Sequence, residues 1–270
     1  MDMIKKVPVS EADQQKSYFK FYERELPGIA PEKRGKVFGP AMDPAKGIPF
    51  GEKANILKPE FQGDEIGFCV MPDGTGYVAD INFLPGATAE MVDWYYLWRG
   101  LDPLRFTIAD PANNVGGHTM QTQKALDEDL TIQERLWDST QTVLKATPMA
   151  PKTTFLNFKY PGLCGFDMDL IGTDICKSLI CICHYDDGEP PVAGPDYFIC
   201  HQLVEKDGGV EVRTKIWHGW VMRYGKDYRS LADFRMQPLE TKALLIQNAE
   251  SWARLAPILP QLYAEEKDNF

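Results

Sequence analysis

The sequence has no long run of apolar residues. No stretch approaches the roughly 20 residues that a helix needs to cross a bilayer. The first residues, which include Lys5 and Lys6, are not followed by the apolar core of a signal peptide. We therefore expect a soluble, cytoplasmic protein that does not bind membranes.

Positive charge is also in short supply, with 29 Lys and Arg against 39 Asp and Glu, a formal net charge of −10. Such a chain repels phosphate backbones, and no basic cluster offsets the repulsion, so nucleic acid is not an expected partner. Hydrophobic residues make up 44% and charged residues 25% of the 270 positions. This balance is typical of an ordinary globular protein with one large domain. A small molecule is the partner that we expect.

Cysteine is sparse: six residues in 270 are too few for a disulfide-stabilised secreted domain. Cys181, Cys183 and His184 suggest a metal site, but residues 178–184 alternate like a strand. That alternation places both cysteines on one face and the histidine on the other. A zinc site also needs a second ligand pair, and none follows at a suitable spacing. We expect buried free thiols here.

Several familiar catalytic motifs are missing. The sequence contains no GxGxxG, no P-loop, no GxSxG and no HExxH. These absences argue against four protein classes: dinucleotide-binding enzymes, P-loop NTPases, serine hydrolases of the nucleophile-elbow type and zinc proteases. Acid–base chemistry by histidine would have to use one of only four residues: His118, His184, His201 and His218.

The composition changes near residue 60. Residues 1–60 are rich in Pro, Gly and Lys and contain one convincing helix, over 10–26. We predict that they form an N-terminal arm or subdomain packed on a main body of residues 61–270. The arm could serve as the contact of a homodimer or as a lid over a pocket.

The main body begins with strand patterns. Pro72, Asp73 and Gly74 form a hairpin turn signal between the first two strands. A long hairpin through Gly208 and Gly209 joins the last two. The expected strands cover residues 66–71, 77–83, 153–159, 178–185, 197–206 and 210–224.

Two helices complete the predicted main body. Thr88 can cap a helix over 89–99, and a helix over 240–259 ends at Pro260. Trp252 lies on the apolar face of the second helix. A long amphipathic helix laid across a curved antiparallel sheet covers the apolar face of that sheet. The predicted class is therefore α+β, with a cavity between helix and sheet that suits a bulky apolar ligand.

The densest aromatic segment is Trp94-Tyr95-Tyr96-Leu97-Trp98. On a helix Trp94 and Trp98 share one face, and Tyr95 lies on the next. Core packing is the simple interpretation of these rings. The functional interpretation is that some of them form the wall of a pocket for a planar substrate.

A set of short segments between residues 65 and 265 carries a resemblance to a known family. The segments are residues 93–98, 101–106, 110–114, 133–137, 166–168, 172–174, 201, 208–213 and 255–263. In these segments the chain resembles the 2,4-diacetylphloroglucinol hydrolases and the related phloretin hydrolases. The resemblance implies a helix-grip (START-like) domain with a small N-terminal subdomain. It also implies zinc-dependent cleavage of a carbon–carbon bond between an aromatic ring and an acyl group.

The resemblance further implies a zinc site, most of whose ligands this chain replaces. The family has a His after the Asp-Pro motif, a Glu before the Trp of the next helix, and a His and a Glu four residues apart on the C-terminal helix. The corresponding residues are Asn114, Glu134, Gln247 and Ser251. Zinc binds neutral amides poorly, and a substitute His118 would still leave the helix without a strong ligand. We therefore expect no cofactor, with zinc as the alternative.

The same comparison gives the catalytic candidates Glu134, His201 and Asn114. Glu134 beside Asn114 in an apolar cavity should have a raised pKa and act as a general acid or base. His201 corresponds to a pocket histidine of the family and is its candidate partner. A structural hydrogen bond on a strand is the alternative for His201, and His218 is the second choice.

Seven further residues are candidates for binding the substrate. Aromatic rings would form the wall, and polar uncharged side chains could donate hydrogen bonds to a carbonyl. Alternatively, the two polar side chains of the C-terminal helix satisfy each other or a buried water. The candidates are Trp94, Trp98, Phe106, His118, His218, Gln247 and Ser251.

From these replacements we predict a metal-independent enzyme that cyclises, isomerises or rearranges an apolar, carbonyl-bearing intermediate of natural-product metabolism. A shaped cavity and a few hydrogen bonds to a polarised carbonyl suit such reactions, including an intramolecular cycloaddition. The first alternative is the reaction of the family, hydrolytic carbon–carbon cleavage with zinc. The second is a binding protein that has kept the cavity and lost the chemistry.

Overall fold

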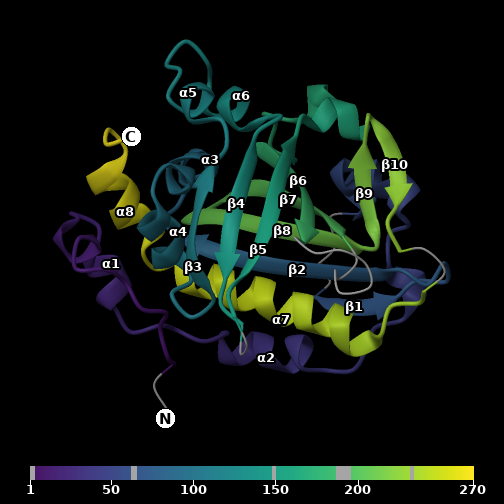
Figure 1. The fold of residues 1–270 in the computed structure, drawn as a ribbon. Helices are drawn as coiled ribbons and strands as arrows, with labels where there is room; N and C mark the ends of the chain where they lie inside the picture. The colour runs from purple at the N-terminus through teal and green to yellow at the C-terminus, as the bar shows by residue number, and fades with distance from the viewer. Residues whose placement is uncertain (1–3, 62–65, 148–149, 187–195, 232–233) are drawn as a thin grey trace.

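The fold is known from a computed structural model, which describes residues 4–61, 66–147, 150–186, 196–231 and 234–270 (Figure 1). Eight antiparallel strands form one sheet in the order β1-β2-β8-β7-β6-β5-β4-β3. These strands are β1 Gly67–Val70, β2 Gly76–Pro85, β3 Asn114–Thr119, β4 Thr140–Lys145, β5 Lys152–Lys159, β6 Ser178–Asp186, β7 Tyr197–Lys206 and β8 Gly209–His218. A second, two-stranded sheet consists of β9 Trp220–Arg223 and β10 Lys226–Arg229.

The longest helix, α7 Pro238–Leu255, lies across the sheet and contacts β1 and β2 (Figure 1). Trp252 and Leu255 are buried in a core cluster that also contains sheet residues. This arrangement confirms the predicted α+β class and the helix-grip architecture. The other α-helices are α1 Lys20–Glu23, α2 Pro31–Val37, α3 Ala89–Trp98, α4 Pro103–Ala109, α5 Thr122–Ala125, α6 Ile132–Leu136 and α8 Leu259–Glu266.

Local signals account for the first hairpin and for the start of α3. In the turn between β1 and β2, Gly74 has φ +88° and the Asp73 carboxylate accepts a hydrogen bond from the Thr75 amide at 2.9 Å. Glycine adopts this left-handed conformation without strain. Thr88 accepts a hydrogen bond from the Met91 amide at 3.3 Å and so caps α3.

Three turn residues act differently from the prediction. Pro31 begins α2, a second helix in a segment for which only one was predicted, because proline fits the first turn, where its missing N–H is not needed. Pro260 likewise lies in the first turn of α8 rather than only ending α7. Gly219, with φ +103°, ends β8 and directs the chain into β9, so the strand predicted over 210–224 divides in two.

The N-terminal residues pack on the main body at several places. The helix predicted over 10–26 is reduced to the 3₁₀ turn η1 Asp13–Gln15 and the short α1. Apolar side chains from the N-terminal segment enter all three core clusters, so this segment shares the core of the sheet and helices. The domain boundary near residue 60 stays a prediction. These side chains are Tyr18, Phe21, Ile29, Val37, Ile48, Phe50, Ile56 and Leu57.

The central strands have different chemistry on their two faces. Cys181, Cys183 and Cys200 are buried free thiols in an apolar cluster on one face, and burial raises the pKa of each. His184 and His201 alternate with these cysteines and line a cavity on the other face. No helix within the described ranges is long and apolar enough to cross a membrane.

Candidate functional site

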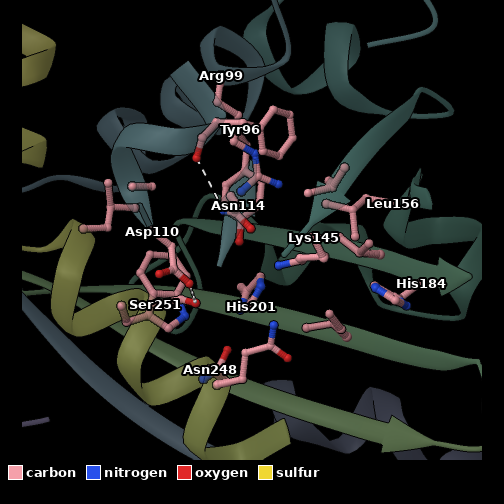
Figure 2. Close-up of a pocket in the computed structure, with 18 of the residues that line it drawn as sticks. Tyr96, Arg99, Asp110, Asn114, Lys145, Leu156, His184, His201, Asn248 and Ser251 are labelled. Atoms are coloured by element: carbon pink, nitrogen blue, oxygen red, sulfur yellow. Dashed lines mark hydrogen bonds between the residues drawn. The ribbon is translucent and has the colours of Figure 1, made fainter. Parts of the chain in front are cut away.

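A cavity of about 150 Å³ lies between α7 and the sheet, with α3 and α4 closing one side (Figure 2). An apolar cavity of this size accommodates one benzene ring. Its apolar wall comes from α3, α4, the sheet and α7 and includes Tyr96, Phe106, Leu156, Ile182, Trp252 and Leu255.

Five of the residues proposed from the sequence line this cavity. Their convergence comes from three parts of the chain: α4 and β3, the middle of β7, and the cavity face of α7. Gly117 contributes to this packing, since a Cβ there would lie 2.6 Å from the Phe106 ring. Their chemical roles stay predictions. The five are Phe106, Asn114, His201, Gln247 and Ser251.

Glu134 does not line the cavity, and the expected raised pKa is wrong. It is the third residue of α6, where its carboxylate accepts hydrogen bonds from the Thr131 amide and hydroxyl at 2.8 and 2.7 Å. Its pKa is lowered by these bonds from Thr131. Thr131 and Glu134 form a capping box, a role that the Thr-x-x-Glu spacing alone can indicate.

Trp94 and Trp98 are also outside the cavity. Their rings stack at 5.1 Å and are almost fully buried in the core, where Trp94 also meets the edge of Tyr263 from α8. The prediction that they form the pocket wall is wrong because their shared helix face points toward α8. Tyr95 and Tyr96, on the neighbouring face, line the cavity instead.

Two predicted histidines lie elsewhere. His118 is exposed on β3, where Nδ1 lies 2.9 Å from the Thr142 hydroxyl. His218 is buried at the end of β8 with its ring against the edge of Tyr197, and does not line the cavity. In their place the structure brings in His184, which stacks on Tyr197 at 4.1 Å.

His201 lies at the centre of the cavity floor in Figure 2. Its Nδ1 is 2.9 Å from the Thr214 hydroxyl, and its ring packs against Tyr96 and Trp252. Burial, with a smaller contribution from Arg99, lowers its pKa to about 3. Burial likewise lowers the pKa of His184 to about 3, with Lys145 adding to the effect. Both imidazoles are therefore neutral near pH 7.

Two cations of the cavity, Lys145 and Arg99, were not predicted from the sequence. Lys145 ends β4 and pairs directly with Asn114 across the β3–β4 ladder, next to a bulge at residue 115. The Arg99 guanidinium lies over the rings of Tyr96 and Phe106, at 4.0 and 4.7 Å from their centroids. Neither cation forms an ion pair with a carboxylate among the described residues.

Asp110 is the carboxylate that lines the cavity, and its charge is compensated. It forms a buried ion pair with Arg254 and accepts a hydrogen bond from the Ser251 hydroxyl at 3.2 Å. Because the Ser251 proton points to Asp110, the lone pairs of its oxygen remain as acceptors. The cavity as a whole is therefore positively charged, through Lys145 and Arg99.

Polar atoms without protein partners surround the same space. Within the described ranges the buried Tyr95 hydroxyl, the Asn114 side-chain oxygen and His184 Nδ1 have no hydrogen-bond partner. An unpaired buried polar group costs about 1–3 kcal/mol, so three of them around one cavity favour a polar ligand or water there.

These side chains do not fit a zinc ion. The predicted ligand positions present two amides and a hydroxyl, Lys145 carries a positive charge, and Glu134 is bound in its capping box. Within the described part of the chain, no group of three His, Cys, Asp or Glu side chains could hold a metal. Zinc requires imidazole, thiolate or carboxylate donors, which this wall does not bring together.

Comparison with known proteins shows to which family this chain is related. The family model of the DAPG hydrolase PhiG domain matches residues 48–264. This chain belongs to the 2,4-diacetylphloroglucinol (DAPG) hydrolase family. A phloretin hydrolase from Eubacterium ramulus is 32% identical over 271 residues, covering 98% of this chain and 96% of that relative. A 2,4-diacetylphloroglucinol hydrolase from a Pseudomonas species is 26% identical over 222 residues, covering 78% and 74%.

Membership of the DAPG hydrolase family confirms the resemblance found in the sequence and corrects the predicted reaction. The relatives are enzymes, so this chain is an enzyme, but they are named hydrolases. The prediction of a cyclase or isomerase is therefore wrong. Among solved structures, that of Ara h 8.0201 aligns with a TM-score of 0.44 and 6% identity, covering 70% of this chain and 99% of that chain. A likeness this weak carries no inference about activity.

Proposed function

We propose that this enzyme hydrolyses the carbon–carbon bond between an aromatic ring and its acyl group in an acylated phenol. The observation that carries the proposal is the match to phloretin hydrolase along almost the whole chain. The cavity supports it, because its volume suits one substituted ring and its wall combines apolar surface with convergent polar groups.

The reaction consumes one water. Water adds to the carbonyl carbon, and the bond from that carbon to the ring breaks with its electron pair going to the ring. The ring carbon takes up one proton, and the acyl group leaves as a carboxylic acid. An ortho hydroxyl makes this possible because protonation of the ring carbon before the bond breaks converts the ortho C–OH into a ketone, and the electron pair of the breaking bond then delocalises onto that ketone oxygen.

His201 is suited to polarise the carbonyl. Its Nδ1 is paired with Thr214, while Nε2 has no partner among the described residues and is available to a ligand. A neutral imidazole can donate a hydrogen bond to an oxyanion without first losing a positive charge. We assign this role to His201, with the oxygen of Ser251 accepting a hydrogen bond from the attacking water.

We also propose that the reaction needs no zinc, because Asn114, Lys145, Gln247 and Ser251 are a poor set of ligands for it. The function is tested by incubating the purified enzyme with 2,4,6-trihydroxyacetophenone and separating the products. Equal amounts of acetic acid and phloroglucinol are expected. An unchanged ligand after long incubation, across several acylphenols, would show a binding protein instead.

A further inference from the structure

The cavity has a charge opposite to that of the chain. The protein carries a formal charge of −10, yet the charged groups facing the cavity are Lys145, Arg99 and an Asp110 already paired with Arg254. His184 and His201, which also face it, are neutral at pH 7. A ligand entering this cavity therefore meets an uncompensated positive field.

Lys145 is the cation best placed to meet a ligand. Figure 2 shows its side chain pointing toward the middle of the cavity, near Asn114 and His201. Lys145 has no hydrogen-bond or ion-pair partner among the described residues, whereas Arg99 stacks on two rings and donates to Gln141 at 3.3 Å. An ammonium at a partly buried position in this cavity gives up part of its hydration, and no acceptor among the described residues replaces the lost hydrogen bonds.

We propose that Lys145 binds the ionised oxygen of a phenol, so that the cavity selects acidic phenols and holds them as phenolates. The choice of a phenolic ligand rests on the proposed function; the anion site itself rests on the charges and contacts of the cavity wall. Arg99, which stacks on Tyr96 and Phe106, adds positive potential and does not take the place of Lys145.

The charge balance of the empty and the filled cavity favours this pairing. Burial lowers the pKa of Lys145, Asp110 raises it, and Arg99 lowers it by a smaller amount. A phenolate oxygen beside the ammonium would raise that pKa again and keep the lysine charged. The same ion pair would stabilise the electron density that reaches the phenol oxygen when the ring–acyl bond breaks.

Binding of a phenolate by Lys145 can be measured with a ligand that undergoes no reaction, because the bound phenol should be ionised. 4-Nitrophenol has a single ring, carries no acyl group to be cleaved, and is yellow only when ionised. Its spectrum is recorded with and without enzyme at a pH where the free phenol is mostly neutral, and its affinity is followed by quenching of tryptophan fluorescence. 4-Nitroanisole, a methyl ether that cannot ionise, is the matched neutral ligand.

We expect the wild-type enzyme to bind 4-nitrophenol in its yellow form and to prefer it to 4-nitroanisole. Lys145→Met should lose the yellow shift and about 10- to 100-fold in affinity for the phenol, while binding the ether as before. Lys145→Arg should keep the shift, and so should Lys226→Met, which changes an exposed lysine on β10. Lys145→Gln repeats the test with a polar side chain.

A colourless bound phenol in the wild type, or a yellow one in both Lys145→Met and Lys145→Gln, would overturn the inference. A failure of the proposed hydrolysis gives a different result. In that case trihydroxyacetophenone stays intact while the Lys145-dependent shift of 4-nitrophenol is still present. If hydrolysis occurs and the shift does not, the phenolate site is wrong and the hydrolase remains.

Discussion

Asn114 and Lys145 face each other across the β3–β4 ladder, and both side chains line the cavity between α7 and the sheet (Figure 2). An amide and an ammonium thus occupy the end of the cavity where zinc ligands were sought. This pairing replaces the predicted partnership of Asn114 with Glu134. We therefore infer that the positive charge of the site comes from the Lys145 side chain and not from a metal ion.

The new position of Glu134 leads to a clear expectation for activity. Glu134→Gln should keep the rate of acylphenol hydrolysis within about twofold, because the side chain caps α6 and does not reach the cavity. Thr131→Ala removes the other residue of the capping box and should lower the free energy of unfolding by about 1 kcal/mol. Steady-state kinetics and urea unfolding measure the two effects. A 100-fold loss of rate in Glu134→Gln would show that Glu134 takes part in catalysis and would contradict this assignment.

His201 should matter for the rate. His201→Phe keeps a ring of similar volume between Tyr96 and Trp252 and removes the hydrogen bond to the carbonyl. We expect kcat to fall by about 10²–10³-fold, the usual effect of losing one oxyanion donor. The exposed His118→Phe is the matched control and should be close to wild type. Equal kinetics for the two variants would refute the role of His201.

The buried histidines also make stability depend on pH. His184 and His201 have a pKa of about 3 in the fold against 6.5 ordinarily, so between these values the unfolded chain binds two more protons. Burial raises the pKa of Asp93 from 3.8 to about 6, so this group binds one more proton in the folded state between those values. Two histidine protons minus one Asp93 proton leave the unfolded chain with one more bound proton than the folded state.

Between about pH 4 and 6, stability should therefore fall as the pH falls, by about 1.4 kcal/mol per unit. Removing one histidine, as in His201→Phe, should make the curve nearly flat over this interval. Urea unfolding at several pH values gives both slopes. A wild-type curve that rises toward pH 4 would show that the histidines are not buried in their neutral form.

The buried pair of Asp110 and Arg254 should dominate the stability of this end of α7. Asp110→Asn removes the buried counter-charge of Arg254 and leaves the guanidinium only the partly exposed Glu250, 3.1 Å away. Removing one partner of a buried ion pair typically costs about 3–5 kcal/mol. Ser251→Ala removes only one hydroxyl hydrogen bond to the same carboxylate and should cost about 1 kcal/mol. Chemical denaturation compares the two. Similar losses in both variants would mean that the ion pair contributes little.

Elements with strong local signals could be predicted from the sequence. The turn at Asp73 and Gly74, the Thr88 cap and the apolar face of α7 each depend on neighbours within a few residues. The strands β3 and β4 were overlooked because Gly116 and Gly117 weaken the strand pattern and their pairing is set by distant contacts.

The site was predicted less completely than the fold. Phe106, Asn114 and His201 were found because the motifs around them resemble a family. Lys145 follows no motif, and only the register of β4 against β3 places it in the cavity. Glu134 was misplaced although the spacing Thr131-x-x-Glu134 is itself a capping signal.

The most direct test of the account is hydrolysis by enzyme that has been treated with a chelator and assayed for metal. We predict well under one zinc per chain, an unchanged melting temperature, and equal release of phloroglucinol and acetic acid from trihydroxyacetophenone. Loss of activity and of thermal stability on chelation, both restored by zinc, would contradict it, since a bound metal stabilises the state that binds it.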